Sequence, residues 1–364
     1  MWREYRRLVD VAEDIAQAWT AAEHRYEAFA DIVWERTGNL DLLPFGDLAN
    51  VPALLESPEI AALQRPSTFS DLYFKLYDNG RFWVEVLNWW GSDINVHDHD
   101  FAAVQFQLRG RSLNAVYRFD REAVADHLAI GTLSVAHAEL WQENSRSIVR
   151  PGAAEPHNVR HLDVPTVSLL IRTHPDPSYG PQNNYLAPLI AGDYGVADTV
   201  FRKKMGSLRL LGQHGQPEFC RAFERTVAGH THAQNLFTVV KLIDLLFLPD
   251  YRHLLEAYGL KGEIEAGIVQ AAAVHRAQEF LDNTIKFIPQ LTETERLATA
   301  VLSSAFSRSS LDTLVGSLAA RGTHLDLDDA VHVISSKLDH SLRRQFRAAL
   351  NTLDLAAAPA FKAA

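Results

Sequence analysis

The first part of the chain carries a helical pattern. Apolar side chains between Leu8 and Trp19 recur at the three- and four-residue spacing of an amphipathic helix. Gly38 follows the last turn, where a left-handed helix cap is usual. The pattern therefore predicts one helix over residues 2 to about 37, and then a loose connector with short helices over 42–66.

The middle of the chain has the pattern of a β-rich domain. From about residue 71 to 191, short runs rich in Val, Phe, Trp, Tyr and Leu are separated by turn residues. Asn79-Gly80 lies between two such runs, which is a strong signal for a β-hairpin. Further predicted strands are FAAVQFQLR, SLNAVYRF, TLSVAHAELW, RSIV and PTVSLLIR. Many short strands at close spacing predict a sandwich or a barrel.

The last part of the chain becomes helical again. Thr292 and Glu295 have the spacing of a capping box at the start of a helix. Asp326 is a predicted N-cap for a further helix that runs to about Leu350. The Ala-rich tail from residue 356 is expected to fray.

Composition narrows the function classes. The chain of 364 residues has 35 Lys and Arg against 45 Asp and Glu, a formal net charge of −10, so no nucleic-acid partner is expected. The single cysteine, Cys220, excludes an internal disulfide framework and suits a reducing compartment. No apolar run reaches the ~18 residues of a membrane span. The charged N-terminus lacks the apolar core of a secretory signal, so we expect a cytoplasmic protein without a membrane partner.

The candidate chemistry lies in the histidines. His97 and His99 are two residues apart in strand-like sequence, so both side chains point to the same face, about 6–7 Å apart at Cα. His157 lies in a later predicted strand, which the barrel can bring across its interior. Three neutral imidazoles on one side of a metal ion leave its other side open for substrate, water or O₂.

These motifs resemble those of the cupin superfamily, whose fold is a small double-stranded β-barrel. The first cupin motif is matched by Gly91, His97, His99 and Gly110, and the second by Pro151, Gly152 and His157. The sequence is closest to the cysteine-dioxygenase branch at His157-Asn-Val-Arg-His161, Val164-Pro-Thr-Val-Ser168, Lys75-Leu-Tyr-Asp-Asn-Gly-Arg and Val86-Leu-Asn-Trp-Trp90. The resemblance covers roughly residues 70 to 190.

The resemblance implies a mononuclear Fe(II) centre held by His97, His99 and His157. In that branch the substrate chelates the metal, and O₂ then oxidises the substrate. The resemblance also implies an α+β fold, with a central cupin-type double-stranded β-barrel flanked by an N-terminal helical segment and a C-terminal helical domain. We place the helical segment at 1–66, the barrel at 67–205, the helical domain at 206–355 and a frayed tail at 356–364.

Two departures from the family pattern bear on the substrate. Many cupins have a fourth ligand, a Glu four or five residues after the second motif histidine, but Ala103 and Val104 stand there. The arginine with which thiol dioxygenases hold the substrate carboxylate should lie near Phe74, where only Lys75 is close. A carboxylate ligand from that motif is therefore absent, and cysteine itself is not the expected substrate.

One predicted strand offers a replacement for the missing arginine. Thiol dioxygenases carry a Ser-x-His-x-Tyr run after the third ligand, where this chain has Ser168, Leu170 and Arg172. These three side chains share one face by strand parity, and the resemblance makes it the inward face. Arg172 can then hold a carboxylate or another anion beside the metal by a bidentate pair.

Further site residues follow from parity and residue type. Gln105 has the parity of the first two ligands, and it could orient a ligand or a substrate, or simply pack. His161 has the parity of the third ligand and is a candidate partner that fixes the tautomer of its ring. The second His-x-His, at His230, lacks strand context and is expected to be a surface or packing feature. At the substrate pocket we place Trp90, Tyr117, Trp141, Ser168 and Lys75.

Three functions fit these observations. The first is a mononuclear non-heme iron oxygenase that acts with O₂ on a small chelating, anionic substrate such as an amino acid or a thiol acid, in a specialised biosynthetic pathway. The second is a redox-neutral, metal-dependent isomerase, lyase or hydrolase, and the third is a ligand-sensing protein with a structural metal. Iron is expected, although three imidazoles also accept Mn, Ni, Cu or Zn. The helical flanks could form a lid or a homodimer interface.

Overall fold

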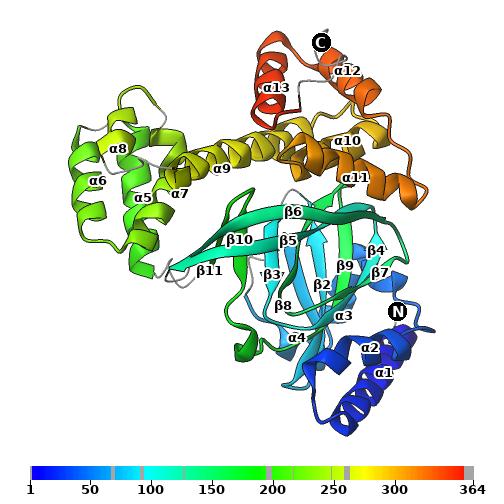
Figure 1. The fold of residues 1–364 in the computed structure, drawn as a ribbon. Coiled ribbons are helices and arrows are strands. Elements are labelled where there is room, and N and C mark those ends of the chain that lie inside the picture. The colour runs from blue at the N-terminus through cyan, green and yellow to red at the C-terminus, as the bar shows by residue number, and fades with distance from the viewer. Residues whose placement is uncertain are drawn as a thin grey trace.

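The structure is a computed structural model of the chain. It describes residues 2–66, 70–90, 94–125, 128–193, 199–215, 217–246, 248–257 and 263–355. Figure 1 shows a central β-barrel with the N-terminal helices against one side and the C-terminal helices on another. Among the described residues, no helix combines the length and the apolar character that crossing a membrane requires.

The N-terminal segment is helical but is broken at its middle. It contains α1 (Trp2–Ala21), α2 (Tyr26–Arg36), η1 (Leu43–Gly46), η2 (Leu48–Asn50), α3 (Val51–Leu55) and α4 (Pro58–Leu63). The prediction of one helix to residue 37 is wrong, because Glu23 and His24 have φ angles of 56° and 55° and turn the chain. The indole N–H of Trp19 donates to the carbonyl of Arg25 across this turn.

Two antiparallel sheets form the barrel. The first has the strand order β1 (Leu72–Asp78), β2 (Phe82–Trp89), β9 (Thr166–Thr173), β4 (Ala103–Arg109) and β7 (Arg146–Val149). The second closes on itself in the order β10 (Asn183–Leu186), β11 (Ile190–Asp193), β6 (Leu128–Trp141), β5 (Ser112–Ala125), β8 (Gly152–His161) and β3 (Ile94–His99). A short turn, η3 (Pro177–Tyr179), lies between β9 and β10. The predicted hairpin at Asn79-Gly80 is confirmed, since it joins β1 to β2 and Gly80 has a φ of 79°.

The strand order is that of a jelly roll. One sheet contains β2-β9-β4-β7 and the other β3-β8-β5-β6, which is the pattern of two interlocked Greek keys. The predicted α+β fold with a central cupin-type double-stranded β-barrel is therefore confirmed. The topology places β3 beside β8, so two segments far apart in sequence become hydrogen-bonded neighbours.

The first sheet is buried on both faces, which specifies its register. Its outer face carries Val84 and Val104, which are fully buried under the N-terminal helices. Its inner face carries Leu87, Ala103 and Leu170, which form a separate small cluster inside the barrel. The polar side chains of this inner face therefore point into the barrel beside the second sheet.

The C-terminal part is helical, as predicted. Figure 1 shows α5 to α8 as one lobe, from which the long α9 leads to the remaining helices above the barrel. The elements are α5 (Thr199–Gln213), α6 (Glu218–Ala228), α7 (His232–Leu246), α8 (Arg252–Ala257), α9 (Glu263–Phe280), the π-helical turn η5 (Leu281–Ile285), α10 (Glu293–Ser304), α11 (Arg308–Ala320), α12 (Leu327–Lys337) and α13 (His340–Thr352).

In this part of the chain two predicted helix caps are confirmed, and one predicted helix is in fact two helices. The capping box of Thr292 and Glu295 is confirmed at the start of α10. Asp326 caps α12 through the backbone N–H of Asp329. The single helix predicted from Asp326 to residue 350 is wrong, because Asp339 caps a new helix, α13. The tail 356–364 lies outside the described residues, and the proposed domain boundaries stay a prediction.

Candidate metal centre

The three predicted ligands meet inside the barrel. In the antiparallel pair of β3 and β8, His97 lies opposite His157. His99 follows two residues along β3 and shares the face of His97. One nitrogen from each ring lies within 4.8 Å of the others, and Nε2 of His99 is 2.9 Å from Nε2 of His157. The three imidazoles therefore converge on one point.

Burial keeps these imidazoles neutral. His97, His99 and His157 are 2%, 7% and 8% exposed. Burial lowers the pKa of His157 to about 3 and also lowers the pKa of His97. The pKa of His99 lies well below its usual value because of burial and, next, the neighbouring ring charges and Arg172. Neutral imidazole is the form that binds a metal ion.

Hydrogen bonds at Nδ1 of His97 and of His157 leave Nε2 of each ring with its lone pair. Nδ1–H of His97 donates to the carbonyl of Asn95 at 2.8 Å, and Nδ1–H of His157 donates to Oδ1 of Asn114 at 2.9 Å. In both rings Nε2 is therefore the nitrogen with a lone pair. Within the described part of the chain, the buried Nδ1 of His99 has no hydrogen-bond partner.

This donor set fits a transition-metal ion. Two imidazole nitrogens 2.9 Å apart need either a proton or a shared cation between them. Among the described residues, the group that could share one ion contains His97, His99 and His157, and the buried Ala103 and Val104 contribute no ligand atom. Three protein ligands leave coordination positions open, as in catalytic rather than structural sites. Imidazole suits Fe, Zn, Cu and Ni, so the residues do not select one metal.

A small cleft of about 60 Å³ opens onto the cluster. Trp141 lies in its wall. Arg150 and Glu155 form a half-exposed ion pair of 4.0 Å at the rim. The remaining lining residues include His99, His157, Asn114, Val116, His137, Glu139, Ser147, Ile148 and Val149.

Trp90 is not among the residues that line this cleft, and a role for it at the substrate pocket stays a prediction. It follows the end of β2, is 47% exposed and donates its backbone N–H to the carboxylate of Asp71. Trp89 is the inward residue instead. Its indole N–H donates to Oγ of Ser168 at 3.3 Å, and its ring stacks on His161 with centroids 4.8 Å apart. A shift of one residue along a strand moves a side chain to the opposite face.

Tyr117 also lies away from the cleft. It is fully buried on the outer face of β5, where its hydroxyl donates to the carbonyl of Ser304 at 2.9 Å. Its ring lies next to Phe306, with centroids 6.3 Å apart. Asn114, on the same strand, points inward. Tyr117 therefore contacts the C-terminal helices, and a pocket role for it stays a prediction.

His161 is buried inside the barrel beside Trp89 and Ser112, and its role as a partner of the third ligand stays a prediction. Its Nδ1 lies 3.0 Å from Oγ of Ser112. Asn114 instead contacts the ring of His157. Gln105 is buried and lies in register with Ser147, a residue of the cleft wall.

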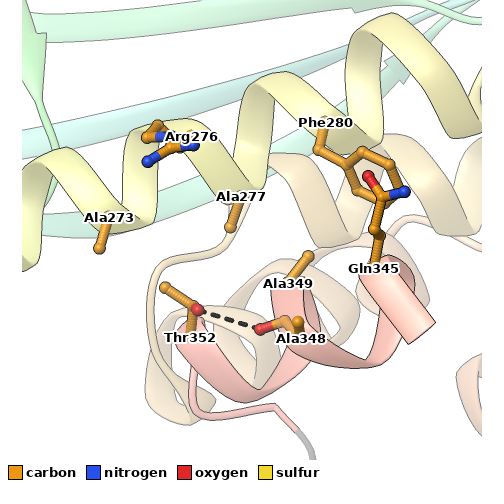
Figure 2. Close-up of a pocket in the computed structure, with 8 residues that line it drawn as sticks. All are labelled: Ala273, Arg276, Ala277, Phe280, Gln345, Ala348, Ala349 and Thr352. Carbon is orange, nitrogen blue, oxygen red and sulfur yellow. Dashed lines mark hydrogen bonds between the residues drawn. The ribbon is translucent and has the colours of Figure 1, made fainter. Parts of the chain in front are cut away.

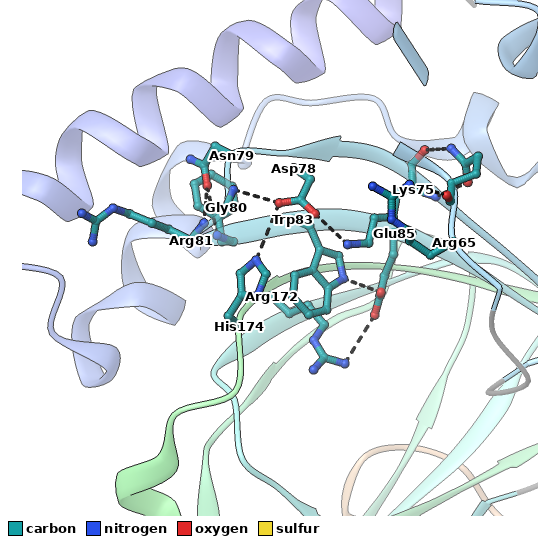
Figure 3. Close-up of polar contacts among 12 residues, drawn as sticks. Arg65, Lys75, Asp78, Asn79, Gly80, Arg81, Trp83, Glu85, Arg172 and His174 are labelled. Carbon is teal, nitrogen blue, oxygen red and sulfur yellow. Dashed lines mark hydrogen bonds and ion pairs between the residues drawn. The ribbon is translucent and has the colours of Figure 1, made fainter. Parts of the chain in front are cut away.

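Arg172 faces the interior of the barrel, as strand parity indicates. Its guanidinium carbon lies 3.3 Å from the ring centroid of Phe101, and the ring centroids of Phe101 and His99 are 4.4 Å apart. Trp83 lies on another side at 4.5 Å, and the carboxylate of Glu85 is 3.7 Å from the guanidinium (Figure 3). Burial lowers the pKa of Arg172, and its buried Nε has no hydrogen-bond partner among the described residues.

Lys75 belongs to the same polar group but not to the cleft. Its Nζ lies 2.7 Å from Oδ2 of Asp78 and 4.2 Å from the ring centroid of Trp83. Asp78 also lies 3.6 Å from Nε2 of His174 (Figure 3). Asp78 and Trp83 hold its ammonium group, and a role for Lys75 at the substrate pocket stays a prediction.

The sequence pattern alone does not reveal the polar residues behind the ligands. Asp98 lies between the first two ligands, and its carboxylate accepts the backbone and side-chain N–H of Asn183 at 2.6 and 2.8 Å. It also accepts a hydrogen bond from the hydroxyl of Tyr185 at 2.8 Å, and these bonds join β10 to β3.

Asn114 and Glu139 lie on β5 and β6. The alternation around Asn114 indicates an inward polar side chain, but its contacts depend on the strand register.

The motif glycines have conformations that suit glycine. Gly152 has a φ of 85°, and a Cβ there would lie 3.2 Å from the ring of Tyr179. Gly110 has a φ of 70°, and a Cβ there would lie 3.0 Å from Oγ1 of Thr166. Left-handed backbone of this kind is open to glycine at little cost. Gly91 lies outside the described residues.

A larger cavity lacks comparable chemistry. It has a volume of about 470 Å³ and lies between α9 and α13, lined largely by alanines (Figure 2). Arg276 is the titratable residue among the eight that line it. At the second His-x-His, His230 lies 3.5 Å from Nζ of Lys204, and the side chain of His232 lies outside the described part.

Known structures match only part of this chain. No family model matches the chain, and no curated protein matches it. A protein from Bacillus halodurans matches 33% of this chain and 80% of its own length at 17% identity and a TM-score of 0.22. A Klebsiella pneumoniae protein with a double-stranded β-helix domain matches 31% and 85% at 13% identity and a TM-score of 0.21. The DMSP lyase DddQ from Ruegeria pomeroyi matches 31% and 57% at 16% identity and a TM-score of 0.21. Similarity at this level carries no argument about activity.

Proposed function

We propose that the protein is a mononuclear non-heme iron oxygenase, similar to the cysteine-dioxygenase branch of the cupins, that acts with O₂ on a small anionic chelator. The observation that carries this proposal is the convergence of three buried, neutral imidazoles without a carboxylate among them. A shell of this kind adds no negative charge to Fe(II), so the centre favours an anionic ligand such as an amino acid or a thiol acid. When bound, the metal supplies the redox chemistry, and the protein supplies binding and orientation.

Arg172 supports an anionic substrate. Its guanidinium contacts the ring of Phe101, which in turn contacts His99, so a permanent positive charge lies one aromatic ring from the metal ligands. Charges act more strongly in the barrel interior than in water. Glu85, at 3.7 Å, offsets part of this charge, while the buried Nε–H still lacks an acceptor among the described residues. A substrate carboxylate is a suitable acceptor for it.

The cleft restricts what reaches the ligands. A volume of about 60 Å³ accepts only part of a small molecule. Val116, Ile148 and Val149 give the wall an apolar side that keeps bulk water away from the imidazoles. His137 and Glu139 give it a polar side, which favours a substrate with hydrogen-bonding groups.

Metal content and oxygen consumption test this proposal. Purified protein loaded with Fe(II) should hold about one ion per chain, because the three rings form one cluster. His97→Ala, His99→Ala and His157→Ala should each lower that occupancy strongly, whereas His230→Ala, in the second His-x-His, should not. The loaded protein should consume O₂ when a panel of thiol carboxylates and amino acids is added.

Each contrary outcome has a defined meaning. Turnover of a panel compound without O₂ uptake would replace the oxygenase with a redox-neutral lyase or isomerase on the same barrel. Metal binding that raises thermal stability without any turnover would favour a ligand-sensing protein. Full metal occupancy in all three alanine variants would remove the centre itself.

A further inference from the structure

We infer that Glu139 is a positioning residue that fixes the tautomer of His157 through Asn114. The three residues come from β6, β5 and β8, which are consecutive strands of the closed sheet (Figure 1). Nδ1 of His157 is 2.9 Å from Oδ1 of Asn114, and Nδ2 of Asn114 is 3.2 Å from Oε1 of Glu139. The inference rests on the proposed metal centre and names the groups that orient one of its ligands.

The chain of hydrogen bonds can run in one direction only. An ionised carboxylate accepts hydrogen bonds and donates none, so Glu139 selects the amide nitrogen of Asn114 as its neighbour. The amide oxygen then faces His157, and because that oxygen also only accepts, Nδ1 of the ring must carry the proton. Nε2 is left with its lone pair directed at the ligand group.

Trp141 holds the carboxylate in place. Its indole N–H, which can only donate, lies 2.7 Å from the same Oε1 of Glu139 that accepts from Asn114. The hydroxyl of Ser147 lies 3.5 Å from that oxygen. Trp141 and Asn114 are 4% and 2% exposed, so bulk water does not substitute for either donor.

Loss of Glu139 would release the amide of Asn114. A flipped amide presents its NH₂ group to Nδ1 of His157, which favours the tautomer with the proton on Nε2. That tautomer has no lone pair on Nε2 for a metal ion. Removal of an outer group that orients a metal ligand typically lowers metal affinity about 10–100-fold.

Two measurements on the full chain test the inference. One is the ¹⁵N spectrum of the metal-free, histidine-labelled protein, in which the His157 signal is assigned by its loss in His157→Gln. The other is Zn²⁺ affinity, measured by competition with a chromophoric chelator, which requires no oxygenase chemistry. Wild-type protein should show His157 protonated on Nδ1.

Variants then separate the charge of Glu139 from its acceptor oxygen. Glu139→Leu should weaken Zn²⁺ binding about 10–100-fold and move the His157 proton towards Nε2. Glu139→Gln keeps an oxygen that accepts from both donors, so it should stay close to wild type. Glu143→Leu, at an exposed position in the turn after β6, is the matched control and should change neither readout.

A double variant tests whether Glu139 acts through Asn114. Asn114→Leu alone should weaken Zn²⁺ binding, and adding Glu139→Leu should weaken it no further, since coupled residues are not additive. An additive loss in the double variant would overturn the inference. A wild-type His157 protonated on Nε2 would also overturn it, and that measurement does not depend on the folding of any variant. Absence of Zn²⁺ binding in wild type would instead overturn the proposed metal centre, while the metal-free spectrum still decides the tautomer.

Discussion

Single side chains decide what the barrel interior can bind. On the inner face of β9, Arg172 places a fixed cation two residues beyond the buried, apolar Leu170. The guanidinium contacts the rings of Trp83 and Phe101 and has Glu85 as its carboxylate neighbour. Arginine offers a rigid fork of donors that matches a carboxylate in a way that lysine cannot.

The proposed role of Arg172 is testable by steady-state kinetics on an anionic substrate. Arg172→Ala should raise KM about tenfold or more, because a lost hydrogen bond to a charged group costs ~1.5–3 kcal/mol. Arg172→Lys should restore part of the affinity, since it keeps the charge and loses the fork. Arg81→Ala, an exposed arginine of the β1–β2 turn, is the control. An unchanged KM in Arg172→Ala would remove the residue from the binding site.

At the scale of elements, strand alternation explains which site residues are predictable. His97 and His99 need only a strand to share a face, and the surrounding apolar alternation indicates one. The same rule fails at a strand end, where Trp90 falls just beyond β2 and Trp89 takes the inward place. The sequence pattern does not reveal the break between α1 and α2, because Glu23 adopts a left-handed backbone without being a glycine.

Contacts between strands depend on register, which the sequence pattern does not contain. The contact of Asn114 with His157 requires β5 to lie beside β8 in one particular register, and that follows from the topology of the whole barrel. The same holds for Asp98, whose partners come from β10. The sequence therefore predicts the ligands and the barrel, and leaves the groups that orient them to the fold.

Asp98 gives a prediction for the β3–β10 pairing. Asp98→Ala leaves the buried hydroxyl of Tyr185 and two N–H groups of Asn183 without their acceptor. An unsatisfied buried group costs about 1–3 kcal/mol, so the free energy of unfolding should fall by at least that amount. Urea unfolding measures it, with exposed Asp31→Ala as a control expected within ~0.5 kcal/mol of wild type. A fall no larger than that of the control would mean that β10 is held by other contacts.

At the scale of the whole molecule, β8 connects the candidate metal centre to the C-terminal helices. His157 points into the barrel from this strand, while Arg160 points outward and pairs with Asp282 at 2.7 Å. Both charged side chains are almost completely buried, and Asp282 lies in the π-helical turn η5. Together with the hydrogen bond of Tyr117 to Ser304, this pair ties the outer face of the barrel to the helices above it.

This buried pair predicts a strong and non-additive effect on stability. Arg160→Met leaves the carboxylate of Asp282 buried without its cation, and breaking a buried pair in this way costs about 3–5 kcal/mol. The double variant Arg160→Met/Asp282→Leu removes both charges, so it should recover much of the loss. Urea unfolding followed by tryptophan fluorescence measures each variant, with Arg308→Met in the exposed Arg308–Asp312 pair as a control expected to change by less than ~1 kcal/mol. Additive losses in the double variant would show that the two charges act independently, and the link between barrel and helices would then rest on other contacts, such as the hydrogen bond of Tyr117 to Ser304.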